Sequence, residues 1–283
     1  MPDTPGNKRP RLSVQPGWAS AAPAGSTTCV YLVGAGPGDP ELMTVRAARL
    51  LEVADAVFHD ALVPQAILDR AGPTAELIAV GHRSGGSKPA VGPVALEMAD
   101  RAARGELVVR LKGGDPFLFG RGAEEATALL EAGVAFEVVP GVTSALAGPA
   151  AAGIPVTHRG LAGSVTIVAG HESDGEPERV RWDTLAVASD TLVVLMGVSR
   201  LKQLAARIIA AGRSPETPAA VVMAATRPEQ RQVVAGLGGI AEAARSAGIA
   251  APAVLVVGEV VLLAEALGGY LVTEVAATAA QSP

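Results

Sequence analysis

The feature that most constrains the fold is an alternation of short aliphatic runs with longer segments of helical spacing. Residues 29–33, 107–111 and 165–169 are runs rich in Val, Leu and Ile, and segments 45–54 and 201–211 have apolar residues at helical intervals. Continuous apolar runs of this length are typical of strands buried on both faces. Strands that alternate with helices favour an α/β fold with mainly parallel sheets covered by helices.

The same alternation predicts the other elements. Further strands are expected at 56–58, 77–80, 136–139, 191–196, 219–223 and 253–257, with an additional strand at 230–235. Further helices are expected at 93–104, 123–132, 144–152 and 240–247. Gly and Pro interrupt the pattern between 140 and 163. We therefore expect an N-terminal α/β domain at 29–140, a connecting segment at 141–163 and a C-terminal α/β domain at 164–270, with a ligand cleft between the domains.

The two ends of the chain differ from this core. Residues 1–28 are dominated by Pro, Gly, Ser and Thr and contain no apolar core of a secretory signal. We expect a disordered tail there and a flexible tail at 271–283. No uninterrupted apolar run reaches the roughly 18 residues of a membrane span. The sequence thus favours a cytoplasmic protein without a membrane partner.

Charge and cysteine content exclude several function classes. The net charge of −5 argues against a general nucleic-acid binder, which would carry a basic excess. Cys29 is the single cysteine, so an intramolecular disulfide and a multi-cysteine metal site are excluded. His158 and His171 lack metal-ligand spacing and favour structural hydrogen bonding. We predict no metal.

Two glycine-rich loops could bind a ligand. The first, Gly-Ala-Gly-Pro-Gly-Asp at 34–39, follows a predicted strand but fails the dinucleotide fingerprint, because Asp39 occupies the place of the third glycine. The second runs from Lys112 through Gly113, Gly114 and Asp115. Paired glycines let backbone amides approach a ligand, and the aspartate can accept from ribose hydroxyls or an ammonium group. No phosphate-loop Lys-Ser/Thr follows, so a nucleoside without phosphates, such as S-adenosylmethionine (SAM), is favoured. A simple turn remains the alternative for each loop.

Taken in order along the chain, several motifs resemble one family. They are GAGPGD at 34–39, HDALV at 59–63, VGHR at 80–83, VVRLKGGDPFLFGRG at 108–122, VVPGVTS at 138–144, GIPVTHR at 153–159, TLVVLMG at 191–197 and PAVLVVGEVV at 252–261. This series, which covers about residues 29–267, resembles the uroporphyrinogen-III C-methyltransferases of the tetrapyrrole methylase superfamily. The GxGPGD motif alone marks the wider superfamily, whereas LKGGDPFxFGRG and GIPxTHR are specific to this group.

The resemblance implies a fold, an activity and a set of site residues. It implies two α/β domains with SAM in the cleft, a homodimer, and methylation of uroporphyrinogen III at C2 and C7 to give precorrin-2 for sirohaem and cobalamin synthesis, with S-adenosylhomocysteine as the by-product. It implies Asp60 as the proton acceptor and places His82 at the position of a lysine proton donor. The implied SAM contacts are Pro37, Gly113, Gly114, Asp115, Leu118, Thr143, Ser144, Met196 and Ala225.

The polycarboxylated substrate requires local positive charge despite the net charge of −5. Candidates are Arg121, Arg83, Arg159 and Lys112. Arg121 is the first choice because a guanidinium binds carboxylates through two parallel hydrogen bonds. For Arg83 and Arg159, an exposed charge without a ligand is an equal alternative.

Several residues depart from the family pattern on the side of the substrate. His59 replaces the usual Tyr before the aspartate, His82 replaces Lys, Ala151 replaces Tyr, and Leu195 replaces Tyr before Met-Gly. A histidine titrates near pH 6.5 and a lysine near 10.4, so the donor chemistry at position 82 would change. Two alternatives stay open: a related methyltransferase with another acceptor, and, from a different class, a nicotinamide oxidoreductase or a nucleotide sensor. The absence of the third glycine of the dinucleotide fingerprint from the 34–39 loop argues against the nicotinamide oxidoreductase and the nucleotide sensor.

Overall fold

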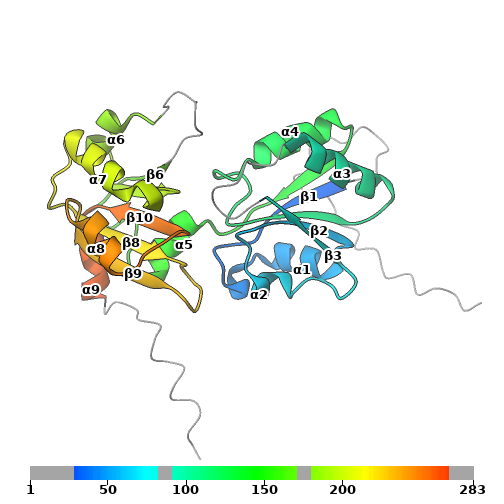
Figure 1. Cartoon of the computed structure of the whole chain (residues 1–283), viewed down its shortest axis with the longest axis horizontal. Coiled ribbons are helices and arrows are strands. Elements are labelled where there is room, and N and C mark those ends of the chain that lie inside the picture. The colour runs from blue at the N-terminus through cyan, green and yellow to red at the C-terminus, as the bar shows by residue number, and fades with distance from the viewer. Residues whose placement is uncertain (1–28, 82–90, 171–179, 268–283) are drawn as a thin grey trace, which may run out of the picture.

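The computed structural model describes residues 29–81, 91–170 and 180–267, and it consists of two α/β units side by side (Figure 1). The first unit contains the strands β1 (Cys29–Gly34), β2 (Ala56–Asp60), β3 (Glu76–Val80), β4 (Val108–Lys112) and β5 (Ala135–Val139). They form a sheet of order β3-β2-β4-β1-β5 in which every pair is parallel.

Helices cover both faces of this first sheet, because its strands point apolar residues to both sides. The short 3-10 helix η1 (Pro40–Leu42), α1 (Val45–Val53) and α2 (Gln65–Leu68) lie on one face, and α3 (Val91–Ala103) and α4 (Gly122–Glu131) on the other (Figure 1). Val33 and Leu51 belong to the core of one face, and Leu32 and Leu129 to that of the other. Thr44 caps α1 by accepting a hydrogen bond from the Ala47 amide at 3.2 Å.

The second unit contains the strands β6 (Val165–Ala169), β7 (Thr191–Leu195), β8 (Pro218–Met223), β9 (Arg231–Gly236) and β10 (Ala253–Val257), in the order β6-β7-β10-β8-β9. Here the expectation of a mainly parallel sheet is wrong. Only β6 and β7 are parallel, and β10 runs antiparallel to both β7 and β8. The reason lies in the connections between the strands. β9 follows β8 along the chain and pairs with it antiparallel. β10 lies between β7 and β8 and runs in the opposite direction to both.

Helices also cover both faces of the second sheet. The helices α6 (Trp182–Ala188), α7 (Leu201–Ala210) and α8 (Ile240–Ser246), with the 3-10 turn η2 (Val198–Arg200), lie on one side. On the other side are α5 (Ser144–Ala151), the 3-10 helix η3 (Glu259–Leu262) and α9 (Leu263–Ala266). The predicted connecting segment therefore includes a helix, α5, that packs on the second sheet.

The predicted strands and the longer helices are confirmed, with ends shifted by at most two residues. The sequence did not predict the short helices α2, α6 and α9. The two predicted tails, 1–28 and 271–283, lie outside the described residues. Among the helices that the structure describes, none is long and apolar enough to cross a membrane.

Candidate ligand and active site

The loops that follow the strands of the first sheet converge at one edge, because the carboxyl ends of parallel strands share an edge. The loops after β1 and β4 are joined directly. The Gly114 amide donates to the Gly36 carbonyl at 2.8 Å, and the Gly36 amide donates to the Gly114 carbonyl at 3.2 Å. The two predicted glycine-rich loops thus form one continuous structure.

Glycines are required here because three backbones meet. A Cβ atom on Gly34 would lie 2.5 Å from the Cα of Gly141 and 2.6 Å from the carbonyl oxygen of Gly114, distances that side chains do not adopt. Gly114 also has a φ of +66°, in the left-handed region that favours glycine. The sequence suggested that the paired glycines allow a ligand to approach the backbone. The structure shows that Gly34, Gly114 and Gly141 also allow three backbone segments to pack against one another.

Asp115 joins the loop after β4 to the loop after β5. Its Oδ1 accepts from the Phe117 amide at 2.8 Å, and its Oδ2 accepts from the Gly141 amide at 3.0 Å. Three residues after Pro140, Thr143 caps α5 by accepting from the Ala145 amide at 3.2 Å. Asp115 therefore fixes the two loops that carry Gly114, Thr143 and Ser144, and each carboxylate oxygen keeps a further lone pair for a ligand.

Two loops of the second domain carry the remaining predicted contacts, Met196 and Ala225. β7 and β8 both run antiparallel to β10, so their carboxyl ends lie at one edge of the second sheet. Met196 follows β7 with a φ of +57°, and Ala224 and Thr226 follow β8 with φ values of +48° and +67°. Left-handed backbone in residues other than glycine is costly and gathers at functional sites. The positive φ values of Met196, Ala224 and Thr226 therefore make the loops after β7 and β8 candidates for a functional site.

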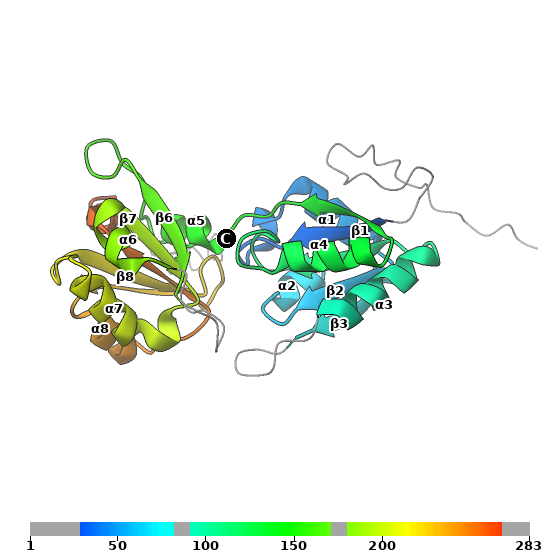
Figure 2. The ribbon, with the colours of Figure 1, turned by 90° about the horizontal axis from the view of Figure 1, so that it is seen from above.

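Contacts join the loops of the two domains. Leu118, from the loop after β4, packs against the core formed by α5 and the second sheet, and Ala225 belongs to that core. The Asp39 amide donates to Thr226 Oγ1 at 3.1 Å, and Arg227 donates to the Leu62 carbonyl at 2.9 Å. In Figure 2, α5 lies in the middle of the molecule, between the second sheet and the loops of the first domain.

The space beside the paired glycines is open. A Cβ on Gly113 would meet only the Leu62 Cβ, at 4.0 Å, and a Cβ on Gly114 would come no closer than 3.8 Å to Thr143. Backbone amides, the fixed Asp115 carboxylate and the Leu62 side chain border this region. Such a set of polar backbone groups and apolar side chains fits a nucleoside without phosphates. Contacts between their loops bring together Pro37, Gly113, Gly114, Asp115, Leu118, Thr143, Ser144 and Ala225, and their binding of SAM stays a prediction.

Asp60, the predicted proton acceptor, ends β2 and belongs to a charged cluster. Its carboxylate forms an ion pair with Arg110, whose guanidinium also contacts the Glu125 carboxylate at 2.9 Å. Lys112 contacts the same Glu125 at 2.9 Å. Arg110, Lys112 and Glu125 are buried, with exposed fractions of 3, 2 and 6%. Two acids and two bases therefore balance one another, which offsets the cost of burying charge.

The sequence missed Arg110 and misjudged Lys112. A signal was present, since both interrupt the otherwise apolar run Val108–Lys112 at alternate positions, which places them on one face of the strand. A charged residue inside a buried strand must find a partner. Because Lys112 is buried against Glu125, it does not present its ammonium group to a ligand.

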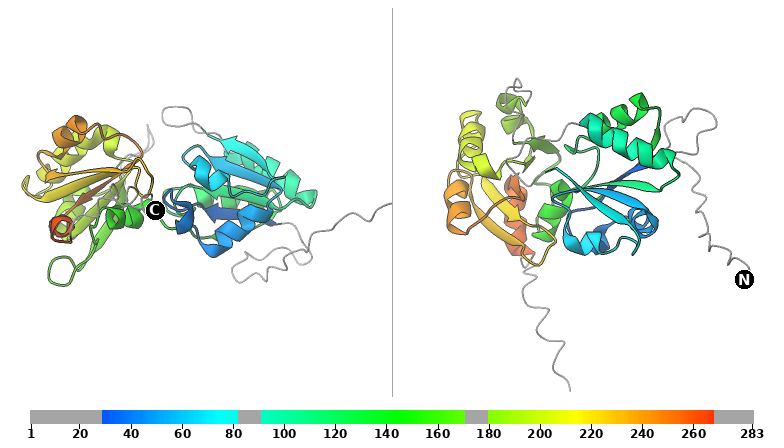
Figure 3. Two further views of the ribbon diagram at one scale, coloured as in Figure 1. Left: turned by 90° about the horizontal axis from the view of Figure 1, so that it is seen from below. Right: turned by 45° about the vertical axis from the view of Figure 1, so that its right-hand side comes forward.

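The structure separates the predicted arginines. Arg121, with a φ of +59°, pairs with Glu124 at 2.6 Å, and this hydrogen bond raises the pKa of the guanidinium above its ordinary value. Arg159 is exposed on the loop between α5 and β6, which projects from the second domain (Figure 3). His82 and Arg83 lie outside the described residues.

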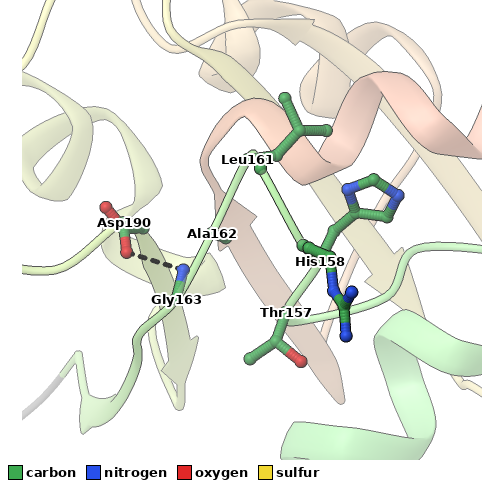
Figure 4. Close-up of a pocket in the computed structure, with 8 residues that line it drawn as sticks. Thr157, His158, Leu161, Ala162, Gly163 and Asp190 are labelled. Carbon is green, nitrogen blue, oxygen red and sulfur yellow. Dashed lines mark hydrogen bonds between the residues drawn. The ribbon is translucent and has the colours of Figure 1, made fainter.

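The loop that carries Arg159 forms an open pocket of its own, lined by Thr157, His158 and Asp190 among others (Figure 4). Asp190 holds this loop: its Oδ2 accepts from the amides of Gly163 and Ser164, both at 2.9 Å. The side-chain hydrogen bond from Ser164, followed by these two amides, lowers the pKa of Asp190. The residues that line the pocket are 157–163 of the loop between α5 and β6 and Asp190, and none of them belongs to the glycine-rich loops.

The structure also places three departures from the family pattern. His59 precedes Asp60 at the end of β2, and Leu195 ends β7 next to Met196. Ala151 ends α5, and its carbonyl accepts from the Gln230 side chain at 3.0 Å. All three therefore lie on the elements that form the candidate site.

Fold and site together define a two-domain α/β protein with a nucleoside-type site at the carboxyl ends of its strands. Residues 29–241 match the family model of the tetrapyrrole (corrin/porphyrin) methylases. The chain belongs to this family.

Relatives and solved structures agree. The chain is 47% identical over 240 residues to the S-adenosyl-L-methionine-dependent uroporphyrinogen III methyltransferase of Methanosarcina barkeri, covering 84% of this chain and 94% of the relative. A uroporphyrin-III C-methyltransferase from Thermus thermophilus, complexed with S-adenosylhomocysteine, aligns with a TM-score of 0.70 at 43% identity, covering 82% and 92% of the two chains. A cobalt precorrin-4 methyltransferase aligns with a TM-score of 0.75 at 32% identity, covering 86% and 99%.

Proposed function

We propose that this protein transfers methyl groups from SAM to C2 and C7 of uroporphyrinogen III, producing precorrin-2 for sirohaem and cobalamin synthesis. The observation that carries the proposal is the convergence of the loops bearing Gly114, Asp115 and Thr143 with the second-domain loop at Ala225. The relative from Methanosarcina barkeri, of which 94% is covered, is named as an S-adenosyl-L-methionine-dependent uroporphyrinogen III methyltransferase, which supports the donor and the acceptor. Bound SAM would supply an electrophilic methyl group.

Much of the catalysis in such a reaction is alignment, because the attacking ring carbon of a reduced tetrapyrrole is already nucleophilic. After the carbon is methylated, a proton must leave the macrocycle. Asp60 is the acceptor in this proposal. Its pairing with Arg110 keeps one carboxylate oxygen occupied, and the side chain retains 30% exposure through which the other oxygen can meet the substrate.

The other site roles belong to the same proposal. His82 would donate or orient a proton, and Arg83, Arg121 and Arg159 would bind substrate carboxylates. Support is strongest for Arg121, since it lies on the loop after β4 that also carries Asp115. Substrate would have to compete there with Glu124, its partner in the structure. The homodimer and the cytoplasmic location expected from the family resemblance complete the proposal, and light scattering coupled to size exclusion tests the first of these.

The experiment is direct. Purified protein is mixed with SAM and uroporphyrinogen III without oxygen, and the products are followed by absorbance and mass. Precorrin-2, or its oxidised product sirohydrochlorin, with two added methyl groups is the expected result. Binding of S-adenosylhomocysteine without any methylated tetrapyrrole would contradict the proposed acceptor.

A second candidate is methyl transfer to another electron-rich tetrapyrrole carbon. It is favoured by one observation: His59, Ala151 and Leu195 depart from the family pattern and lie on the elements that form the site. The same assay with other reduced tetrapyrroles distinguishes the two, because only a retargeted enzyme would turn over one of them faster than uroporphyrinogen III.

A further inference from the structure

The loop that joins β8 to β9, residues 224–230, reaches from the second domain to two loops of the first. Its Thr226 hydroxyl accepts a hydrogen bond from the Asp39 amide at 3.1 Å. Its Arg227 guanidinium donates to the Leu62 carbonyl at 2.9 Å. Asp39 ends the GAGPGD loop, and Leu62 lies two residues after Asp60. Two adjacent side chains thus contact a donor-side loop and an acceptor-side loop.

Arg227 contacts the GAGPGD loop as well. A Cβ on Gly38 would lie 2.5 Å from Arg227 Nε and 2.7 Å from its Cγ, so the arginine stem occupies the place where a side chain at position 38 would stand. Gly38 also has a φ of +151°, a conformation that residues with side chains rarely adopt. Arg227 therefore packs on one loop while it donates to the other.

The β8–β9 loop is itself firmly held in the second domain. The Thr226 amide donates to Gln230 Oε1 at 2.7 Å, and Gln230 Nε2 donates to the Ala151 carbonyl at 3.0 Å. The Ala224 amide donates to the Pro252 carbonyl at 2.9 Å. Ala224 and Thr226 keep left-handed backbone angles within this set of bonds. Because the β8–β9 loop is fixed in the second domain, Thr226 and Arg227 link the position of that domain to the two loops of the first domain that they contact.

We propose that Thr226 and Arg227 are positioning residues that set the methyl-donor loop and the Asp60 loop relative to each other. The assignment of these loops to donor and acceptor rests on the proposed function. Thr226 holds the backbone of the GAGPGD loop, so its loss weakens donor binding. Arg227 donates to the Leu62 carbonyl, just after Asp60, and packs on Gly38. Its loss is therefore expected to disturb the alignment of donor and acceptor. The rate of such a transfer depends steeply on that alignment.

The test compares binding with turnover in the full-length protein. Thr226→Val is expected to weaken the affinity for S-adenosylhomocysteine by roughly threefold to tenfold, the effect of one lost neutral hydrogen bond, and Thr226→Ser to restore it. Arg227→Met is expected to lower kcat about tenfold or more while that affinity stays within about twofold. Arg227→Lys, which keeps the charge and a donor, is expected to recover part of the rate. Calorimetry and the methylation assay measure the two quantities.

A readout independent of turnover decides the Arg227 part. Arg227→Met is expected to increase amide hydrogen exchange in the segment 60–64, whereas Glu229→Gln, an exposed change in the same loop, leaves exchange, affinity and kcat as in the wild type. Unchanged affinity in Thr226→Val, or unchanged exchange in Arg227→Met, would overturn the proposal. A wild-type protein that binds S-adenosylhomocysteine but methylates no uroporphyrinogen III would contradict the proposed function instead, and the affinity and exchange results would still decide the positioning roles.

Discussion

Arg110 forms an ion pair with Asp60 while its other guanidinium nitrogens donate to Glu125 and to the Phe58 and Leu111 carbonyls. The arginine is 3% exposed, and Asp60 retains 30% side-chain exposure. A buried, fully bonded cation therefore supports a partly exposed carboxylate at the carboxyl end of β2, the sheet edge from which the glycine-rich loops also leave. This arrangement fixes the orientation of Asp60 before any substrate binds.

Asp60→Ala is expected to reduce turnover by roughly 10²–10⁴-fold, the usual contribution of a positioned acid–base group. S-adenosylhomocysteine affinity is expected to persist, because the Asp60 carboxylate pairs with Arg110 and forms no hydrogen bond with the glycine-rich loops among the described residues. Rates of methylated product and calorimetric titration measure the two effects. Retained turnover in this variant would remove Asp60 from the mechanism.

Arg110→Met tests the support of that carboxylate. Removing one member of a buried ion pair leaves its partners uncompensated, so a loss of about 3–5 kcal/mol in the free energy of unfolding is expected from urea titration. Arg110→Lys keeps the charge but not the planar fork, and should retain more stability while still lowering kcat. Arg104→Met is the matched control: Arg104 pairs with Glu106 at the surface, where such pairs contribute at most about 1 kcal/mol. Equal stability losses at 104 and 110 would contradict the view of the cluster as a buried network.

Gly114→Val tests the place of the methyl donor. The substitution forces a β-branched residue into a φ of +66° and fills the space beside the paired glycines. We expect S-adenosylhomocysteine binding to be lost. Gly133→Val is the control, because Gly133 has a φ of +74° and open space around it, so it carries the same backbone strain away from the site. If Gly114→Val bound the ligand as well as Gly133→Val does, the donor would have to bind elsewhere.

The sequence predicted the strands well because a buried strand is encoded in its own residues, as in Thr191–Leu195 and Ala253–Val257. It did not predict the direction of β10. An aliphatic run has the same appearance in a parallel or an antiparallel pair when both faces are buried, and its direction follows from the connection that precedes it.

The candidate site could also be predicted only in part, namely where its residues form a local pattern. Paired glycines followed by an aspartate are a local pattern typical of ligand-binding loops, so Gly114 and Asp115 could be predicted from the sequence alone, and the structure places them where the loops of the first domain meet. Arg110 and Arg227 were not, because their roles depend on partners 50 and 165 residues away, Asp60 and Leu62. Arg227 leaves no pattern in the residues beside it, whereas Arg110 interrupts an apolar strand, a signal that it needs a partner but not of which one.

Cys29 provides a chemical test of the first sheet, since it is the single cysteine of the chain. Burial, followed by the nearby Glu137 carboxylate, raises the pKa of its thiol from about 9 to about 11. At pH 8 the thiolate fraction is then about a hundredfold lower than that of an ordinary thiol, and alkylation by iodoacetamide should be slower to a similar degree. Because the folded state holds the proton more tightly, this group favours folding below pH 9, and its contribution is lost as the pH rises towards 11. The urea-unfolded protein is the control, and equal alkylation rates for the folded and unfolded chains would show that the thiol is not protected in this way.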